Sequence, residues 1–218
     1  MGSERAKQFL ELAGIPIIIH TLRAFEQCEA IQEIIVVLSA REAADFVSLA
    51  AGYSLTKLSK VIVGGSTRAE SVLRGLQAVH GTTAGVIAVH DGVRPFVTPD
   101  EITLTVNAAE LYDAAILAAP VNDTIKEVID GGVVRTLNRG RLRRALTPQC
   151  FRYSLLHRAY EQADALGPEV TDESMLVERL GVRIAIVEGN ARNIKITTRE
   201  DLAIAEELLK GSKLGFCS

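Results

Sequence analysis

Short runs of β-branched and other apolar residues alternate along this chain with segments whose apolar residues recur at helical spacing. The apolar runs are 33–39, 60–64, 85–90, 114–121 and 183–188, and the helical segments are 41–51, 67–79, 98–111, 153–166 and 198–209. Three of the runs are apolar nearly throughout, which is typical of strands covered on both faces of a parallel sheet. The alternation predicts βαβ units, and therefore an α/β fold with a doubly wound, mostly parallel sheet.

The chain length of 218 residues suits a single domain of this class. We expect that domain to cover residues 1–209 and a loose C-terminal tail to cover 210–218. Two of the expected helices open with a threonine cap followed by acidic residues, at Thr98-Pro99-Asp100-Glu101 and at Thr198-Arg199-Glu200-Asp201.

The segment 123–142 interrupts the alternation, because it holds two β-like runs joined by Asp130-Gly131-Gly132. An Asp-Gly pair between two such runs predicts a β-hairpin. A hairpin that projects from an α/β core is often an arm that grips a partner. The other interpretation is an antiparallel extension at the edge of the same sheet.

The composition limits the partners that this chain can have. A net charge of −3 gives no global basic character, so we expect no nucleic acid, and any bound anion must be held by a local cluster. The cysteines, Cys28, Cys150 and Cys217, lie far apart without metal-ligand spacing, which indicates free thiols and a cytoplasmic protein. No apolar run approaches the ~18 residues of a membrane span, so we expect no membrane partner.

Polar clusters follow several of the expected strands, at the edge where open α/β sheets bind their ligands. One such cluster is VGGSTRAES over 63–71, where two glycines and small hydroxyls form a strand-to-helix turn. That turn leaves backbone N–H groups available for an anion or the edge of a base. Gly-Gly-Ser is also a common connector without any function.

A second cluster lies in GVIAVHDGVRPFV, residues 85–97, in which an apolar run ends in a carboxylate, a glycine and a guanidinium. Asp91 at a strand end suits a hard cation such as Mg²⁺, and Arg94 can form a bidentate contact with a phosphate. The alternative is an internal ion pair between Asp91 and Arg94 that stabilises the turn.

Two lysines and a threonine complete the candidates. Lys195 lies in a short extended run before a capped helix, Lys7 lies just before an expected helix, and Thr171 or Asp172 caps a helix within 170–178. The chain has no Gly-x-Gly-x-x-Gly, no Walker lysine and no nucleophile elbow, and its four histidines are scattered. Acid, lysines, arginines and glycine turns stabilise charge on phosphates, and they suit a reaction whose nucleophile is already an anion.

The motifs taken together resemble the 2-C-methyl-D-erythritol 4-phosphate cytidylyltransferases of the non-mevalonate isoprenoid pathway. The matching stretches, in chain order, are KQFLELAGIPIIIHTL, GGSTRAESVLRGL, VHDGVRPFV, PVNDTIK, LTPQCFRY, VTDESMLVE and EGNARNIKITTREDLAIAE, which extend from about Lys7 to Leu209. The resemblance implies a Rossmann-like nucleotidyltransferase fold. It also implies transfer of CMP from CTP to the sugar-alcohol phosphate, with Mg²⁺ as cofactor and release of pyrophosphate.

The resemblance also implies roles for individual residues. Asp91 would ligate the metal, Gly92 and Arg94 would lie beside the nucleotide, and Lys7 and Lys195 would balance the charge that builds up at the α-phosphate. The positions around cytosine and ribose would be Gly65, Ser66, Ser71 and Thr147. Those that hold the sugar phosphate would be Thr124, Arg139 and Thr171. In the family the hairpin arm, here 121–142, is exchanged across a homodimer, so Thr124 and Arg139 would serve the neighbouring subunit.

This sequence departs from the family pattern at three places. Family members begin with a strand and a glycine-rich loop that ends in an arginine and MG, whereas this chain starts at Met1-Gly2, so we expect that strand and loop to be missing here. The motif that usually reads HDAARP has Gly92-Val93 in place of the two alanines. Arg143 stands where an aromatic residue is common.

Two alternatives to this activity stay open at the level of the sequence. A ribitol-5-phosphate cytidylyltransferase would share the fold and most nucleotide-site motifs. A catalytically impaired nucleotide-binding paralogue would fit the expected loss of the glycine-rich loop.

Overall fold

The computed structural model describes residues 6–80, 85–163 and 170–214, with the side chains of 212–214 excepted. Its centre is a four-stranded sheet in the order β10-β6-β9-β5. The strands of that sheet are β5 (Val86–Val89), β6 (Ala114–Pro120), β9 (Arg143–Arg152) and β10 (Ala185–Glu188). The helices are α1 (Ile17–Gln27), α2 (Ala40–Ala50), α3 (Arg68–Ala78), α4 (Pro99–Tyr112), α5 (Tyr153–Glu161), α6 (Glu173–Arg179) and α7 (Arg199–Leu214).

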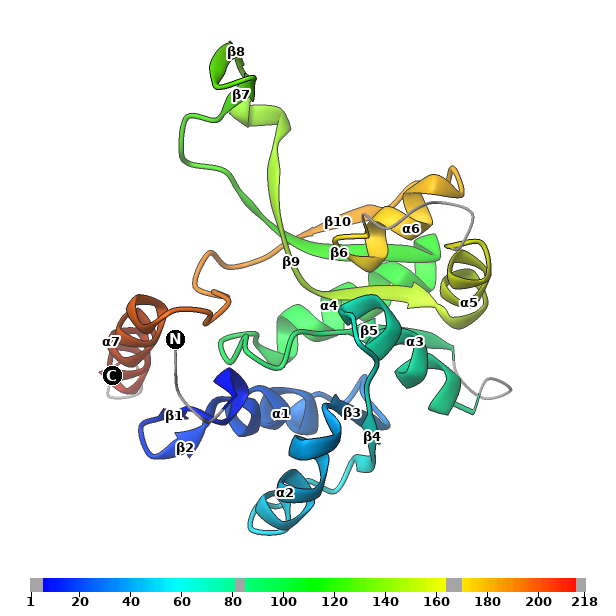
Figure 1. Cartoon of the computed structure of the whole chain (residues 1–218), viewed down its shortest axis with the longest axis vertical. Helices are drawn as coiled ribbons and strands as arrows, with labels where there is room; N and C mark the ends of the chain where they lie inside the picture. Colours follow the sequence, from blue (N-terminus) through cyan, green and yellow to red (C-terminus); the bar gives the residue numbers. More distant parts are fainter. Residues whose placement is uncertain (1–5, 81–84, 164–169, 215–218) are drawn as a thin grey trace.

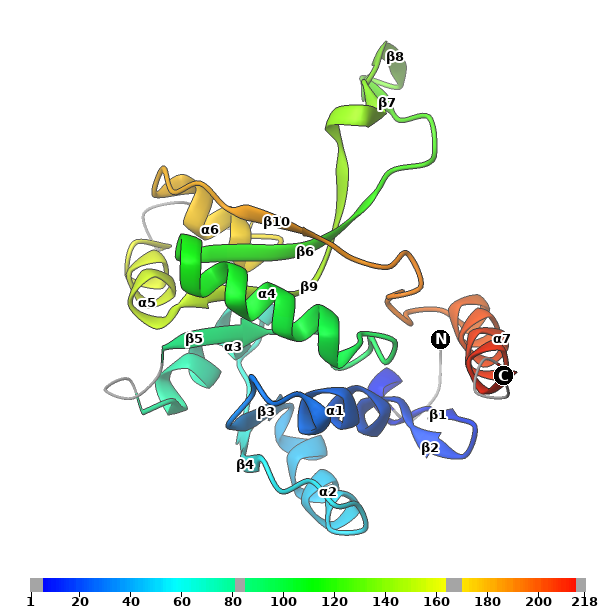
Figure 2. The ribbon, with the colours of Figure 1, turned by 180° about the vertical axis from the view of Figure 1, so that it is seen from behind.

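Helices cover both faces of this sheet, which confirms the predicted α/β class. Along β6 the buried side chains alternate between two cores: Ala115 and Leu117 pack into one core together with residues of α4, whereas Ala114 and Ile116 face the core of α5 and α6. Figure 2 shows α4 lying across one face, and α5 and α6 lie beyond the sheet in that view. A strand that is buried on both faces must be apolar throughout, as the 114–121 run is.

The sheet is mixed because β9 runs antiparallel to its neighbours β6 and β5, while β10 and β6 are parallel. The sequence pattern did not predict β9. Pro148 lies in the middle of this strand, and proline within an apolar run argues against a central strand. The ladder accommodates it at a register shift, where the pairing passes from Ile116–Gln149 to Ala118–Ala145.

A second, smaller sheet consists of β3 (Ile34–Leu38) and β4 (Leu58–Val63), which are paired in parallel. Among the described residues, no strand ladder joins this pair to the four-stranded sheet. The two sheets nevertheless share one apolar core, which includes Leu38 of β3, Phe46 of α2 and Leu117 of β6. Figure 1 shows β3 and β4 beside α1 and α2, below the larger sheet.

The described chain begins with one 3-10 turn, η1 (Lys7–Phe9), followed by the short strands β1 (Glu11–Leu12) and β2 (Ile15–Pro16). Ala13 and Gly14 connect these strands with positive φ angles of 52° and 77°. The expectation that Lys7 lies just before a helix was therefore wrong in detail. Lys7 is exposed in the 3-10 turn, and the β1–β2 hairpin separates it from α1.

The predicted hairpin is present as β7 (Lys126–Ile129) and β8 (Gly132–Thr136). Asp130 and Gly131 have φ angles of 49° and 79°, and two positive φ values in a two-residue loop define a type I′ turn. The hairpin projects from the end of β6 and β9, far from the rest of the chain (Figure 1). It is an arm, and the interpretation as a mere edge extension of the sheet is wrong.

Helix caps follow the sequence signals closely. The Thr98 hydroxyl accepts a hydrogen bond from the Glu101 amide, and Thr198 does the same for Asp201. Asp172, not Thr171, caps α6.

Helix α7 continues past Leu209 to Leu214. No helix in the described ranges is long and apolar enough to cross a membrane.

Candidate functional site

Asp91 follows the carboxyl end of β5 and lies at the centre of a cluster of three cations. Its Oδ2 atom is 3.1 Å from Nζ of Lys195 and 3.3 Å from Nε of Arg94, and its Oδ1 atom is 3.3 Å from Nε of Arg68. The Asp91 side chain is only 12% exposed. We call these four residues the Asp91 cluster.

The charges in the Asp91 cluster decide the protonation state of its carboxyl. Burial alone would raise the pKa of Asp91, but the positive charges of Lys195, Arg68 and Arg94 outweigh burial and lower the pKa to about 2. Asp91 is therefore an anion at neutral pH. Lys195, which is 42% exposed, can also pair with a phosphate if one enters the cluster.

His90 and Thr147 hold the backbone of the Asp91 loop in place. Burial lowers the pKa of His90 to about 4, so the ring is neutral at physiological pH. Its Nε2 lies 3.2 Å from the carbonyl oxygen of Arg94, which can only accept, so Nε2 carries the proton. Nδ1 then accepts from the Thr147 hydroxyl at 2.9 Å, and Thr147 in turn accepts from the Asp91 amide at 3.3 Å. Thr147 thus fixes Asp91 from β9, a strand that the sequence pattern missed.

The segment that carries Lys195 is tied to the same loop. Arg94 donates to the carbonyl oxygen of Asn193 at 2.9 Å, and the Ile196 amide donates to the carbonyl oxygen of Val93 at 2.9 Å. Asn193 is fully buried and donates through Nδ2 to the carbonyl oxygen of Thr147. These bonds bring Asp91, Gly92, Arg94, Thr147 and Lys195 together. The strand-end argument covered Asp91, Gly92, Arg94 and Lys195, whereas only the family resemblance implied Thr147.

The glycine-rich turn before α3 is closed on itself. The Gly65 amide donates to Oγ of Ser71 at 3.1 Å, and the Ser66 amide and hydroxyl donate to the Glu70 carboxylate at 2.6 and 2.8 Å. A Cβ at position 65 would lie 2.3 Å from Cβ of Glu70, so only glycine fits there. The amides that we expected to be available are therefore bonded internally, and a ligand would have to replace these bonds.

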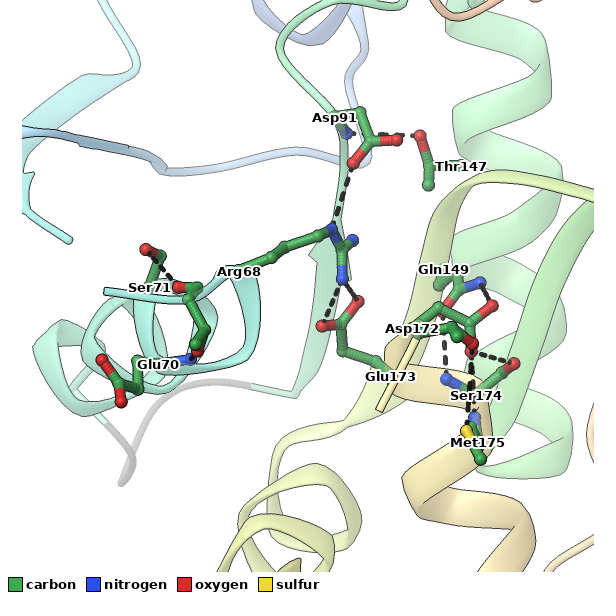
Figure 3. A network of polar contacts seen from close by, with 12 residues as sticks. Arg68, Glu70, Ser71, Asp91, Thr147, Gln149, Asp172, Glu173, Ser174 and Met175 are labelled. Carbon is green, nitrogen blue, oxygen red and sulfur yellow. Dashed lines mark hydrogen bonds and ion pairs between the residues drawn. The ribbon is translucent and has the colours of Figure 1, made fainter. Parts of the chain in front are cut away.

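Arg68 and Glu173 are the members of this site that sequence reasoning missed. Nη1 of Arg68 lies 2.7 and 2.9 Å from the two carboxylate oxygens of Glu173, a side chain with no exposed surface. The Tyr160 hydroxyl donates to the same carboxylate at 3.2 Å. Figure 3 shows Arg68 between Asp91 and Glu173. These partners are far apart in the sequence, so no local pattern could have paired them.

A pocket of about 360 Å³ opens beside the start of α6. Asp172 forms part of its wall, and its carboxylate accepts hydrogen bonds from Gln149 at 2.9 Å and from Ser174 at 2.8 Å. The lining residues are Ile116, Ala118, Arg143, Ala145, Thr171, Asp172, Ser174, Met175, Glu178 and Ile186. The predicted residue Thr171 therefore lines a pocket with both polar and apolar walls that includes Arg143.

Three of the predicted residues lie outside the Asp91 cluster, the glycine-rich turn and the Thr171 pocket within the described chain. Lys7 is exposed and forms none of the ion pairs of Asp91. Thr124 and Arg139 lie on the exposed arm, where Arg139 donates to the carbonyl oxygen of Asn122 at 2.6 Å, and neither lines the Thr171 pocket.

The residues around Asp91 fit Mg²⁺ only if a nucleotide supplies further ligands. The described residues contain no group of three or more His, Cys, Asp or Glu side chains that could hold a metal by themselves. Mg²⁺ is commonly bound by one or two carboxylates together with substrate phosphates. The Asp91 carboxylate, ionised and at a strand end, meets that requirement.

Comparison with known proteins places the chain in a family. The sequence model described as IspD, 2-C-methyl-D-erythritol 4-phosphate cytidylyltransferase, matches residues 1–211. The chain belongs to this cytidylyltransferase family.

Relatives and solved structures agree with this assignment. The 2-C-methyl-D-erythritol 4-phosphate cytidylyltransferase of Bacillus mycoides (strain KBAB4) is 45% identical over 216 residues, which cover 98% of this chain and 93% of the relative. The crystal structure of 4-diphosphocytidyl-2C-methyl-D-erythritol synthase from Anaerococcus prevotii DSM 20548 has a TM-score of 0.87 at 32% identity, with 96% and 92% of the two chains covered. The cytidylyltransferase from Thermus thermophilus has a TM-score of 0.77 at 33% identity, with 94% of each chain covered.

Proposed function

We propose that this protein transfers the cytidylyl group of CTP to 2-C-methyl-D-erythritol 4-phosphate. A phosphate oxygen of the sugar phosphate attacks the α-phosphorus of CTP, the bond to the β-phosphate breaks, and pyrophosphate leaves. The products are 4-diphosphocytidyl-2-C-methyl-D-erythritol and pyrophosphate. The observation that carries this proposal is the Asp91 cluster, in which cations surround one carboxylate at the end of a strand.

In this reaction the protein acts by positioning charged groups around the phosphates, since the nucleophile is already an anion and needs no base. Lys195 is 42% exposed, so its ammonium can turn from Asp91 to a phosphate. Asp91 would hold Mg²⁺ together with the phosphates of the nucleotide, and the charge of the ion would stabilise the anion that develops at the α-phosphate. We assign Lys7 as a second mobile cation, because it is exposed on a short turn and has no acidic partner among the described residues.

We assign the nucleotide to the edge of the sheet where the strand-end loops meet. Ser71 and the Gly65 and Ser66 amides are candidates for contacts with cytosine and ribose, in which the ligand would replace the internal bonds of this turn. Gly92 follows Asp91 in the chain, and Thr147 accepts a hydrogen bond from the Asp91 amide, so we assign both to the same nucleotide site.

We assign the sugar phosphate to the Thr171 pocket and propose that a second copy of the chain completes it. The arm presents Val128, Ile129, Val133 and Val134 with 55 to 65% of each side chain exposed. An isolated two-stranded hairpin is marginally stable in water unless it packs on another surface. A homodimer held by the 121–142 arm would bury these side chains and bring Thr124 and Arg139 to the pocket of the neighbouring subunit.

We also propose that the whole of 1–209 acts as one domain in the cytoplasm. Cys28 and Cys150 are free thiols buried in the core, which suits a reducing compartment.

Pyrophosphate release from CTP, Mg²⁺ and the sugar phosphate tests the proposal directly. The names of the relatives favour methylerythritol phosphate over ribitol 5-phosphate, so the two substrates should be assayed side by side. Release with methylerythritol phosphate supports the assignment. Faster release with ribitol 5-phosphate, or none with either substrate, would refute it.

The Asp91→Ala variant tests the role of the cluster. We expect turnover to fall by at least about 10²-fold, the typical effect of removing one preorganised charged group. Asp45→Ala, which changes an exposed carboxylate on α2, is the matched control and should retain wild-type turnover. Near-normal activity of Asp91→Ala would show that Asp91 is only a structural partner of Arg94.

A further inference from the structure

We propose that Arg68 is a positioning residue that couples the nucleotide end of the site to the pocket beside α6. This inference rests on the proposed function and adds to it a residue that touches neither substrate. Arg68 is the first residue of α3 and contacts two carboxylates that belong to different halves of the site (Figure 3).

The first step of the argument concerns the orientation of Asp91. The shortest contact of Arg68 is with Oδ1 of that carboxylate, whereas the shortest contacts of Arg94 and Lys195 are with Oδ2. The guanidinium of Arg68 therefore restrains the rotation of the carboxylate plane. Without this restraint the plane of the carboxylate could turn away from the nucleotide.

The second step concerns what keeps Arg68 in place when anions arrive. Glu173 has no exposed surface, and a buried carboxylate that loses its cationic partner is strongly destabilised. Arg68 is thus held by Glu173 at 2.7 Å and cannot follow a phosphate as the half-exposed Lys195 can. Arg68 serves to orient Asp91, and Lys195 is the mobile cation.

The third step links Glu173 to the pocket. Glu173 is the first residue of α6 and lies between Asp172 and Ser174, both of which line the pocket. The Asp172 cap and the bond that the Ser174 amide donates to Oε1 of Gln149 make this turn one hydrogen-bonded unit. A ligand that orders the turn also orders Glu173, and through Arg68 it orders Asp91.

Coupling of this kind is reciprocal, so each substrate should strengthen the binding of the other by the same factor. The chemistry of arginine is essential for it. A planar guanidinium can donate to two carboxylates from different nitrogens, whereas the ammonium of lysine is a single point charge. Arg68→Lys therefore retains the charge and removes the bridge.

The experiment is isothermal titration calorimetry with Mg²⁺ and α,β-methylene-CTP, whose α–β bond resists cleavage. The dissociation constant is measured without and with saturating methylerythritol phosphate, and the ratio of the two is the coupling factor. For the wild type we expect a factor within the usual range of about 5 to 150. For Arg68→Lys and for Glu173→Gln we expect the factor to fall towards 1.

Arg152→Lys is the matched control, because Arg152 also pairs with a carboxylate, that of Asp113 at 3.6 Å, but away from the site. It should keep the wild-type factor. A purely structural role for Arg68 would lower the melting temperature of Arg68→Lys and leave the factor unchanged, and that result overturns the inference.

Two further outcomes are distinguishable. A wild-type protein that binds neither ligand contradicts the proposed function itself, before any variant is compared. If Arg68→Lys does not fold, Glu173→Gln decides alone, because it removes the charge that holds Arg68 and leaves Arg68 itself unchanged. A coupling factor in Glu173→Gln that equals the wild-type value then overturns the inference, and a reduced factor supports it.

Discussion

The Asp91→Asn variant tests the electrostatics of the Asp91 cluster without any substrate. The cluster lowers the pKa of Asp91 from 3.8 to about 2 although burial acts in the opposite direction. Since one pKa unit corresponds to about 1.4 kcal/mol, ionised Asp91 contributes about 2 to 3 kcal/mol to the free energy of unfolding. The side chain is 12% exposed, so solvent screens little of this contribution.

The sign of the pH dependence follows from the lowered pKa. The contribution is fully present above the pKa of the unfolded chain, and it is lost as the pH falls through the pKa of the folded protein. With pKa values of 3.8 and about 2, about 1 kcal/mol is already lost at pH 3. Asparagine does not titrate. The difference in unfolding free energy between wild type and Asp91→Asn should therefore narrow by about 1 kcal/mol between about pH 6 and pH 3.

Urea unfolding followed by circular dichroism at several pH values measures this difference, and urea is chosen because it does not screen charges. Asp45→Asn, an exposed substitution on α2, is the matched control. If the difference for Asp91→Asn stayed constant down to pH 3, the three cations would not be holding the carboxylate as described.

Three further predictions concern the arm, the glycine turn and the core. Val133→Asp places a charge on the exposed face of β8 and should convert the proposed dimer to monomer in light scattering. Gly65→Ala forces Cβ to within 2.3 Å of Cβ of Glu70 and should raise the KM for CTP about 10-fold or more (about 1.4 kcal/mol), whereas Gly211→Ala, which meets no atom within 4 Å, should not. Phe151→Ala removes a fully buried ring from β9 and should lower the free energy of unfolding by about 3 to 5 kcal/mol in urea titrations.

The parts of the fold that the sequence predicted are the elements whose structure is determined by residues close together in the sequence. The strand over 114–121 is apolar because both of its faces are buried, and this pattern holds whatever its neighbours are. The Thr98 cap and the Asp130-Gly131 turn depend on a few adjacent residues, so their signals are complete within a short window.

The elements that the sequence missed depend on distant contacts. Helix α1 begins with three consecutive isoleucines after Pro16, a β-branched run with weak helix propensity. Burial of Ile17, Ile18 and Ile19 in the core stabilises it as a helix, and that burial is set by tertiary packing.

The residues of the site also divide into those predicted from the local sequence and those that depend on distant contacts. Asp91, Arg94 and Lys195 could be expected to meet, because each follows or precedes an element at one edge of the sheet. The pairing of Arg68 with Glu173 could not be expected, since it depends on how α6 is placed against α3. The predicted role of Lys7 requires its ammonium to lie beside the α-phosphate of the nucleotide. Lys7 is exposed in a short 3-10 turn, which does not fix the position of its side chain.

Strand β9 connects the arm to the site, so a movement of the arm would be transmitted to the site through this strand. Its ten residues span about 33 Å at ~3.3 Å per residue, from Arg143 beside the arm to Arg152 at the far edge of the sheet. Thr147 lies between these ends and bonds to the Asp91 amide. A tilt imposed on the outer end would reach the loop of Asp91 along the backbone of this strand.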